Sequence, residues 1–570
     1  MPLVHKAVRE AVSLAASFLL LTAAAVSQVS VTTYHNDNGR TGQNMKETIL
    51  TPVTVNSGTF GKLFSHAVDS YVYAQPLYLA SVPIPSKGTH NVVYVATQHD
   101  SLYAFDADRN SGATQGALWH VSFINPAAGI HTLSAKDTKC GDVPPEIGIT
   151  GTPVINPVTR TIYLVARTNE NGVYYQRLHA LDATTGTERA GSPVVISAAI
   201  SGTGVGSVDN QIAFDPLQEN QRAGLLLQNN LVYISWGSQC DNDPYHGWLM
   251  AYDMSTLKQR AVWMTTPDGE QGAIWQGGAA PAGDSSGYAY ITTGNGTFDL
   301  DIDGDDYGNS IVKLSPLKSG AVTVSDYFTP YNQAYLTQKD QDLGAGGPVL
   351  LPDNASKVNP HLLVQFGKSG TLYLVNRDNM GKYNTVDDSQ IVQSIIKAAA
   401  GYGSWMTPVW WNSRLYVSGG GDYIRGYLFH ANTGQFALTS FSQSTTTFNF
   451  PGSTPSLSSN GPLGGILWAL QEDAYSTKGP AVLHAYDALN LASELYNTNQ
   501  NPTRDNPGNA VKFSVPTIAN GKVYVGGEMV VSVYGLLPPS TAEGSSSPAA
   551  STTKNTTSQP SERSAAGTKE

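Results

Sequence analysis

Val93-Tyr94-Val95 is followed by Leu102-Tyr103-Ala104-Phe105-Asp106, and this pair of segments carries the pattern that decides the fold. Both are short runs of β-branched and aromatic residues, which favour β-strands, and the second ends in an Ala-x-Asp turn. The first segment recurs through the chain at intervals of about 61 residues, a period typical of repeat architectures. Its later copies are Ile162-Tyr163-Leu164, Val232-Tyr233-Ile234, Ala289-Tyr290-Ile291, Leu362-Leu363-Val364, Leu415-Tyr416-Val417, Ile466-Leu467-Trp468 and Val523-Tyr524-Val525.

Each repeat holds further strands around this central one. A preceding strand opens at a proline in seven repeats and at Gly224 in the third, and the strand after the centre often ends in an Ala-x-Asp turn, as at Asp182, Asp253 and Asp487. A fourth strand follows in several repeats, for example at Ala117-Leu118-Trp119. Four strands per repeat, eight times over, predict an all-β fold, an eight-bladed β-propeller of four-stranded antiparallel blades. The alternative is a set of β-sandwiches, which the long regular period argues against. The prolines are Pro76, Pro153, Pro281, Pro348, Pro408, Pro455 and Pro516.

The last repeat is short of an outer strand, because the chain becomes polar soon after Tyr534. The segment Phe60-Gly61-Lys62-Leu63-Phe64 is the candidate to supply it. We therefore expect the N-terminal strand to close the ring and remove an exposed sheet edge.

The two ends of the chain differ from the repeats. Lys6 and Arg9 precede a short apolar run that ends in Ala25-Val26-Ser27, so residues 1–27 are predicted to be a secretory signal peptide, with an uncleaved membrane anchor as the alternative. Residues 28–539 form the predicted propeller domain. Residues 540–570 are rich in Ser and Thr and lack aliphatic and aromatic side chains apart from Ala, which predicts a disordered tail. The expected location is secreted or periplasmic, with no membrane span once the signal is removed.

The net charge bears on what the protein binds, and the cysteine content bears on whether it contains a disulfide. A net charge of −11 with no run of basic residues argues against nucleic-acid binding. The chain has two cysteines, Cys140 and Cys240, which in an oxidising compartment suggest one disulfide. The alternative is two separate buried thiols.

The Ala-x-Asp repeats resemble those of pyrroloquinoline-quinone (PQQ) propellers, the quinoprotein alcohol dehydrogenase-like superfamily. The segments from Leu50 to Phe64 and from Gly403 to Pro408 are also similar to that superfamily. The resemblance implies oxidation of a small-molecule alcohol or sugar with PQQ and Ca²⁺. It places Asn295 of Gly294-Asn295-Gly296 as a calcium ligand, Asp305 of Gly304-Asp305 as the catalytic base, and Lys368 against the quinone carbonyls. The alternative for Lys368 is a solvated lysine in a turn.

Three features depart from the superfamily. Its adjacent Cys-Cys pair is absent, and the tryptophan expected beneath the quinone would fall near Ala279–Pro281, where there is none. Its calcium-binding glutamate aligns with Cys240-Asp241-Asn242-Asp243, in which neither aspartate is an assured substitute. The chain has no haem-attachment motif, so electrons would pass to an external acceptor.

The densest acidic cluster in the sequence is a second candidate metal-binding site. Asp299, Asp301, Asp303 and Asp305 alternate along a turn with Gly304 at the sixth position, as in the first half of a calcium loop. Ser310 stands at the twelfth position in place of the bidentate glutamate, and a solvated acidic hairpin is the alternative. The two interpretations compete for Asp305, which does not easily act both as base and as ligand.

Two functions remain open from the sequence. One is a PQQ- and calcium-dependent dehydrogenase with Asn295, Asp305 and Lys368 at its site. The other is a non-catalytic extracytoplasmic platform that binds a protein, a glycan or a cell surface, and a propeller lyase is a third, weaker candidate. The polar segment at Tyr34, His35, Asn36 and Arg40 is expected to cap the ring or to contact ligand.

Overall fold

The computed structural model describes residues 28–317, 320–399 and 401–539. The predicted signal peptide, and the predicted tail from residue 540 onward, lie outside these residues. The chain divides into a large unit, Met1–Leu537, and a small one, Pro538–Glu570. Within the described residues, no helix has the length and apolar character needed to cross a membrane.

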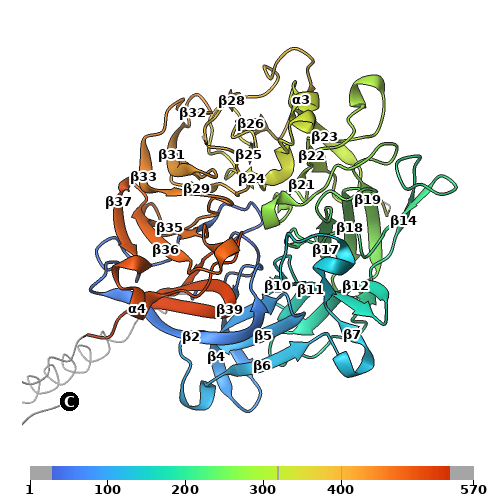
Figure 1. Ribbon diagram of the computed structural model, residues 1–570. Coiled ribbons are helices and arrows are strands. Elements are labelled where there is room, and N and C mark those ends of the chain that lie inside the picture. The colour runs from blue at the N-terminus through green and yellow to red at the C-terminus, as the bar shows by residue number, and fades with distance from the viewer. Residues whose placement is uncertain (1–27, 318–319, 400, 540–570) are drawn as a thin grey trace, which may run out of the picture. The chain divides into compact units, whose positions relative to one another are not determined.

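The large unit is a ring of eight sheets, and in blades 1 to 7 the main strands run from the centre outward in chain order (Figure 1). The eight-bladed propeller predicted from the repeats is confirmed, and each repeated segment lies in the second strand of its sheet. Blade 1 contains β3 (Leu77–Ile84), β4 (Gly88–Thr97), β5 (Ser101–Asp106) and β6 (Ala117–Ser122); blade 2 contains β10 (Val154–Asn156), β11 (Thr161–Glu170), β12 (Val173–Asp182) and β13 (Val194–Val195), with β7 (Ile130–His131) added beside β11. Blade 3 contains β16 (Leu226–Gln228), β17 (Leu231–Trp236), β18 (Trp248–Asp253) and β19 (Gln259–Met264); blade 4 contains β20 (Ala282–Gly283), β21 (Ala289–Thr292), β22 (Ile311–Leu314), β23 (Val324–Thr329) and the parallel β27 (Lys382–Tyr383).

The other four blades follow the same plan. Blade 5 contains β24 (Val349–Leu350), β25 (Leu362–Phe366), β26 (Leu372–Asn376) and β28 (Gln393–Ile395); blade 6 contains β29 (Val409–Trp411), β30 (Arg414–Val417), β31 (Asp422–His430), β33 (Ser442–Phe448) and the short β32 (Gln435–Phe436). Blade 7 contains β34 (Ser456–Asn460), β35 (Leu463–Gln471), β36 (Val482–Asp487) and β37 (Asn490–Asn497), with β1 (Gln43–Asn44) parallel to β34. Blade 8 contains β38 (Thr517–Ala519), β39 (Lys522–Leu536) and β2 (Phe60–Tyr71). The loops between blades hold the hairpins β8 (Leu133–Ser134) with β9 (Glu146–Ile147) and β14 (Ala199–Ser201) with β15 (Gln211–Ala213), and the short helices α2 (Ala135–Thr138), α3 (Gln333–Gln338) and α4 (Pro502–Asp505).

The ring closes through the N-terminal strand, as expected from the sequence. The first half of β39 pairs with β38, and its second half pairs antiparallel with β2, with Phe60 opposite Leu536. Met529 of β39, at φ 57, lies where the register of the β2–β39 pairing shifts, between the pairs Tyr71–Glu528 and Ala67–Val530. Because β2 and β39 come from opposite ends of the chain, closure leaves blade 8 without the open edge that the last repeat alone would have.

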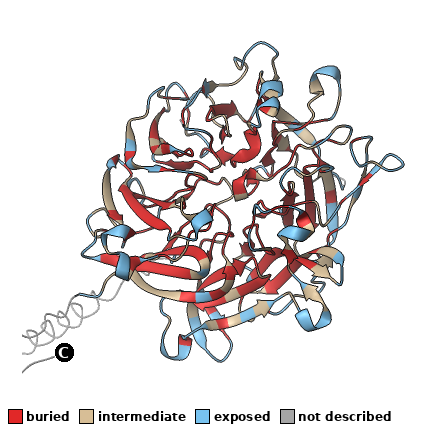
Figure 2. Ribbon diagram, viewed as in Figure 1, coloured by how far each residue is buried: buried red, intermediate tan, exposed pale blue. Residues whose placement is uncertain are grey.

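A tyrosine in the second strand links several blades to their neighbours through a hydrogen bond. This contact explains why a tyrosine and an Ala-x-Asp turn recur in the repeats. The hydroxyl of Tyr94 in blade 1 donates to the carbonyl of Ala183, just after the Ala-x-Asp turn of blade 2. The same bond joins Tyr163 to Met254 in blade 3 at 2.7 Å. Tyr524 of blade 8 makes it to Ala107 of blade 1, across the closure. Between neighbouring blades the apolar side chains form buried clusters, while exposed residues gather at the outer turns (Figure 2).

The polar segment near the N-terminus runs along the inner strands and caps the ring rather than reaching the pocket described below. Its backbone pairs with Tyr78 of blade 1, and later with Leu350, Trp410 and Leu457 of blades 5, 6 and 7. Arg40 is completely buried and donates to the carbonyl of Pro281 in blade 4. One segment therefore bonds to innermost strands around most of the ring.

Candidate functional site

The main candidate site is a cavity of about 450 Å³ built by loops that precede the inner strands of several blades and by the loops that follow β17 and β25. Its lining residues come from segments far apart in the chain, including Asp142, Arg222, Trp275, Trp405 and Lys512. Cavities of this size suit a small organic ligand. The loops meet here because the inner strands of a propeller converge on one central channel.

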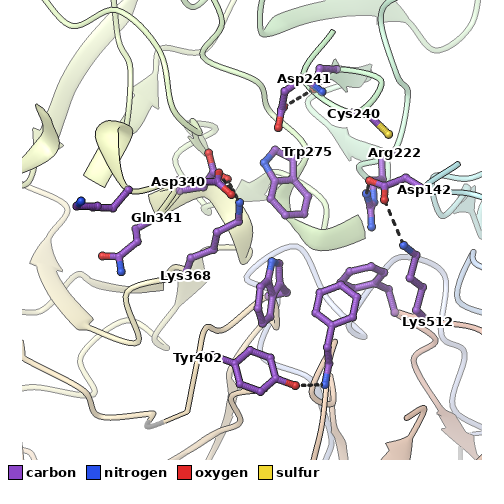
Figure 3. Close-up of a pocket in the computed structure, with 16 residues that line it drawn as sticks. Asp142, Arg222, Cys240, Asp241, Trp275, Asp340, Gln341, Lys368, Tyr402 and Lys512 are labelled. Atoms are coloured by element: carbon purple, nitrogen blue, oxygen red, sulfur yellow. Dashed lines mark hydrogen bonds and ion pairs between the residues drawn. The ribbon is translucent and has the colours of Figure 1, made fainter. Parts of the chain in front are cut away.

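At one end of the cavity, the ammonium group of Lys368 lies between two carboxylates. Its Nζ is 2.8 Å from Oδ1 of Asp340 and 2.6 Å from Oδ2 of Asp342 (Figure 3). The side chain of Asp342 is 9% exposed and that of Asp340 is 70% exposed. Asp342 is therefore held inside the protein, whereas Asp340 remains accessible to a ligand.

Local backbone geometry brings these residues together. Lys368 follows β25, and its backbone N–H donates to the carbonyl of Asp342 at 2.9 Å. A Cβ on Gly367 would lie 2.5 Å from that carbonyl oxygen, so the close approach requires glycine there. Asp340 follows α3 in a left-handed conformation, with φ 52, which turns the chain from the helix toward Asp342.

Asn295, predicted from the sequence as a ligand, belongs to the same group. Its Nδ2 donates to Oδ1 of Asp340 at 3.0 Å, and its backbone N–H donates to Oδ1 of Asp342 at 2.6 Å. Its Oδ1 accepts a hydrogen bond from Nδ2 of the buried Asn309 at 3.0 Å. The structure thus brings together two of the three residues that the family resemblance selected, Asn295 and Lys368, around Asp340 and Asp342.

Burial and pairing act in opposite directions on this ion pair. Burial raises the pKa of Asp342 above its ordinary value, and the positive charge of Lys368 offsets part of that rise. Burial also favours a lower pKa for Lys368, but the two carboxylates outweigh it and the net pKa is raised. Lys368 is therefore a charged donor at neutral pH, held in place by its two partners.

Trp275 lies beside Lys368 and provides a flat apolar surface within the cavity. The Lys368 Nζ is 5.7 Å from the centre of the Trp275 ring. Trp405 and Phe450 line another wall, with ring centres 4.9 Å apart. The sequence interpretation expected a tryptophan near Ala279–Pro281 and found none; the tryptophan in the cavity stands four residues earlier, just before the 3₁₀ turn Gln276–Gly278.

The predicted disulfide is present and lies at the rim of this cavity. Cys140 and Cys240 are bonded, and Cys240 is among the lining residues. Among the described residues, one group of three acidic, histidine or cysteine side chains has its ligand atoms within 4.8 Å of one another: Cys140, Asp142 and Cys240. Because its two sulfur atoms are joined in the disulfide, this group is not a metal site.

The acidic turn does not form part of the cavity. Asp299, Asp301, Asp303 and Asp305 surround the 3₁₀ turn Leu300–Ile302, and none of them lines the cavity or belongs to the group just described. Asp305 is exposed, and the carboxylates beside Asn295 and Lys368 come instead from Asp340 and Asp342. These two aspartates were not predicted from the sequence; the run Asp340-Gln341-Asp342 ahead of the fifth inner strand is the local pattern that could have indicated them.

Comparisons with known proteins establish the fold. No protein-family model matches the chain, and no curated protein sequence is similar to it. Solved structures with the same architecture include quinohemoprotein alcohol dehydrogenase ADHIIG from Pseudomonas putida HK5, with 14% identity over 89% of this chain and 80% of that one and a TM-score of 0.56. The quinohemoprotein alcohol dehydrogenase from Comamonas testosteroni has 15% identity over the same shares, with a TM-score of 0.56. A europium-containing methanol dehydrogenase has 12% identity over 89% of this chain and 98% of that one, with a TM-score of 0.54.

Proposed function

From a propeller fold shared with quinoprotein dehydrogenases, we propose that this chain is an exported dehydrogenase that oxidises the hydroxyl group of an alcohol or a sugar with bound PQQ. The observation that carries the proposal is the position of Lys368, between Asp340 and Asp342 and beside the ring of Trp275. Export, to a secreted or periplasmic location, is supported by the disulfide, since such bonds persist in oxidising compartments.

The residues of the cavity fit a planar quinone. A volume of about 450 Å³ lies within the range of small-molecule sites. Trp275 offers an aromatic face for stacking, and Lys368 offers a charged N–H donor for a carbonyl oxygen.

The same end of the cavity has the oxygen donors that calcium prefers. Asp342 contributes a carboxylate, and Asn295 contributes an amide oxygen from a neighbouring segment. In this proposal Asp342 and Asn295 hold Ca²⁺, Asp340 stays free to act as a base, and the acidic turn at Asp299–Asp306 takes no part. The ammonium group of Lys368 offsets part of the negative charge of Asp340 and Asp342.

Each polar residue then has one role in the oxidation. A bound quinone supplies the acceptor for the hydride that leaves the substrate carbon. Asp340, the exposed carboxylate, accepts the proton of the substrate hydroxyl, so that a carbonyl product remains. Lys368 would offer its charged N–H donor to a carbonyl oxygen of that quinone. Asp342 keeps Lys368 charged and oriented.

The test is reconstitution of the purified protein with PQQ and Ca²⁺, followed by dye reduction with a panel of alcohols and sugars. We expect reduction with at least one of them, and a loss of about 10²- to 10⁴-fold in Asp340→Asn. The matched control is Asp378→Asn, an exposed aspartate that pairs with His361 at 2.9 Å outside the cavity. If Asp305→Asn abolished reduction and Asp340→Asn did not, the assignment of the base would be wrong. If no substrate reduced the dye and PQQ caused no spectral change, a non-catalytic binding platform would be the better description.

A further inference from the structure

Two buried cations lie at the end of the cavity opposite Lys368. Arg222 is 7% exposed and Lys512 is 6% exposed, and both line the cavity. Figure 3 shows them on one side of Trp275, with Lys368 and Asp340 on the other side. They come from loops of different blades, ahead of β16 and β38 respectively. The cavity therefore has a separate positively charged end that the proposed oxidation does not use.

These two cations are incompletely paired. Asp142 is the one carboxylate within 4 Å of either among the described residues, at 3.9 Å from Arg222 Nη1 and 3.5 Å from Lys512 Nζ. Its side chain is 50% exposed, so water already satisfies part of its charge. Within the same described residues, the guanidinium group of Arg222 donates no hydrogen bond to any protein acceptor within hydrogen-bond distance.

Lys512 lies in buried, largely aromatic surroundings, where an incompletely paired positive charge is energetically unfavourable. Burial and, to a smaller extent, the charge of Arg222 together lower the pKa of Lys512 to about 8, against the opposing effect of Asp142. The other groups that face its ammonium are aromatic: Phe450, Tyr475 and Phe513 have ring centres 5.8, 5.5 and 5.9 Å from Nζ. Charges in such an apolar environment interact strongly with an added anion.

We propose that Arg222 and Lys512 form a carboxylate-binding subsite, which selects organic ligands that carry an acidic group and are long enough to lie along Trp275. An incoming carboxylate would accept hydrogen bonds from both side chains, and bonds of this kind between charged groups are among the stronger ones in proteins. Asp142 then balances the remaining charge. The subsite rests on the geometry of the cavity and does not depend on the proposed oxidation.

The acidic group has two possible sources, the quinone or the substrate. PQQ carries carboxylates, and so do hydroxy acids such as gluconate. In the first case the subsite fixes the cofactor, and in the second it makes an acid the preferred substrate. Affinity measurements with each compound separate the two sources.

The primary experiment is calorimetric titration of the full chain with benzene-1,3-dicarboxylate, a planar diacid that undergoes no redox chemistry. We expect binding, weakened about tenfold or more in both Arg222→Gln and Lys512→Met. The neutral dimethyl ester should bind weakly and equally to all variants. The matched control is Lys522→Met, which removes a lysine at the turn between β38 and β39 that pairs with Asp108 at 2.8 Å and does not line the cavity.

The wild-type protein gives an independent readout that does not rely on a folded variant. Because a bound carboxylate favours the protonated form of Lys512, binding near pH 8 should take up a fraction of a proton, and binding near pH 6 should take up none. Titration in buffers of different ionisation enthalpy measures this uptake. Lys512→Met should abolish it.

The arms of the experiment distinguish the source of the acid. If the variants bind PQQ about tenfold more weakly, the quinone supplies the carboxylate. If PQQ affinity is unchanged but the PQQ-loaded variants no longer bind gluconate more tightly than glucose, the substrate supplies it. The proposal is overturned if the diacid, PQQ and gluconate all bind the variants as they bind wild type, or if the wild type takes up no proton near pH 8. Diacid binding without any dye reduction would retain the subsite and remove the proposed oxidation.

Discussion

Nζ of Lys368 lies 2.6 Å from Oδ2 of Asp342, and the two side chains are 15% and 9% exposed. The pair joins the loop after β25 to the segment that follows α3, and a backbone hydrogen bond between the same two residues reinforces it. Asp340 completes the arrangement from the exposed side. A charged donor, a buried carboxylate and an accessible carboxylate are thus fixed before any ligand arrives.

Removing the lysine should destabilise the protein because Asp342 would keep a buried charge without a partner. We expect Lys368→Met to lower the free energy of unfolding by about 3 kcal/mol or more, as is usual when one partner of a buried pair is lost. The double variant Lys368→Met with Asp342→Asn should recover a large part of this loss. Urea denaturation measures both, with the exposed Lys357→Met as the control. Equal losses in the single and double variants would show that the charge of Asp342 is not the cause.

Asn309 should act as a positioning residue for the site. Its Nδ2 donates to Asn295 and to Thr337 of α3, and its Oδ1 accepts from the backbone N–H of Leu343. Asn309→Ala should therefore release Asn295 and weaken calcium binding, measured by direct titration, by about tenfold. It should also cost roughly 1–3 kcal/mol of stability, since buried polar groups lose their partners.

The control for this variant is Asn412→Ala. Asn412 has the same φ of 45 but is exposed, and its side chain makes one long bond to Pro462. It therefore reports the backbone cost of alanine in a left-handed conformation. If both variants lost the same stability and neither changed calcium affinity, the hydrogen bonds of Asn309 would have no positioning role.

Arg40 should be a main determinant of stability in the segment that caps the channel. Its guanidinium donates to the carbonyl of Pro281, to Oγ1 of Thr33 and to the carbonyl of Tyr34, at 2.7 to 3.0 Å. We expect Arg40→Met to cost about 3 kcal/mol or more, because several buried acceptors lose their donor at once. Arg109→Met, at a side chain that is 65% exposed, should change stability little in the same thermal unfolding experiment. A small effect at Arg40 would mean that water replaces the lost bonds.

His66 should make the protein sensitive to mild acid. It is fully buried and stacks on Phe105 at 4.3 Å, and burial lowers its pKa to about 4, against the opposing effect of the Asp106 carbonyl. Between about pH 6.5 and pH 4 the unfolded chain binds a proton that the folded chain does not, so stability falls as pH falls through this window. The contribution is roughly 2–3 kcal/mol.

The measurement is the free energy of unfolding at about pH 7 and about pH 4.5, in wild type and in His66→Gln. The variant should lose less stability on acidification than wild type, and the exposed His131→Gln should behave like wild type. Burial also raises the pKa of Asp306, to about 6, but that group titrates in all three proteins and cancels from the comparison. Equal acid sensitivity in wild type and His66→Gln would exclude His66 as the cause.

The sequence by itself determined the architecture, because the propeller depends on short sequence patterns that repeat along the chain. Each second strand carries its β-branched or aliphatic residues, and the tyrosine and the Ala-x-Asp turn that meet between blades recur in several of the repeats. The disulfide followed from the presence of two cysteines alone, and Asn295 and Lys368 were found because short motifs surround them.

Only the tertiary structure decided which groups share the cavity. Asp340 lies 45 residues from Asn295 and 28 from Lys368 in the chain, and the loops of neighbouring blades bring all three together. Asp305 was selected because Gly304-Asp305 resembles the Gly-Asp motif of the superfamily, yet its side chain is exposed and lies outside the cavity. Trp275, Arg222 and Lys512 come from three further loops, and no local pattern marks them. The physical reason is that strand repeats fix the ring through near-neighbour contacts, whereas the site depends on loops that meet only once the ring has closed.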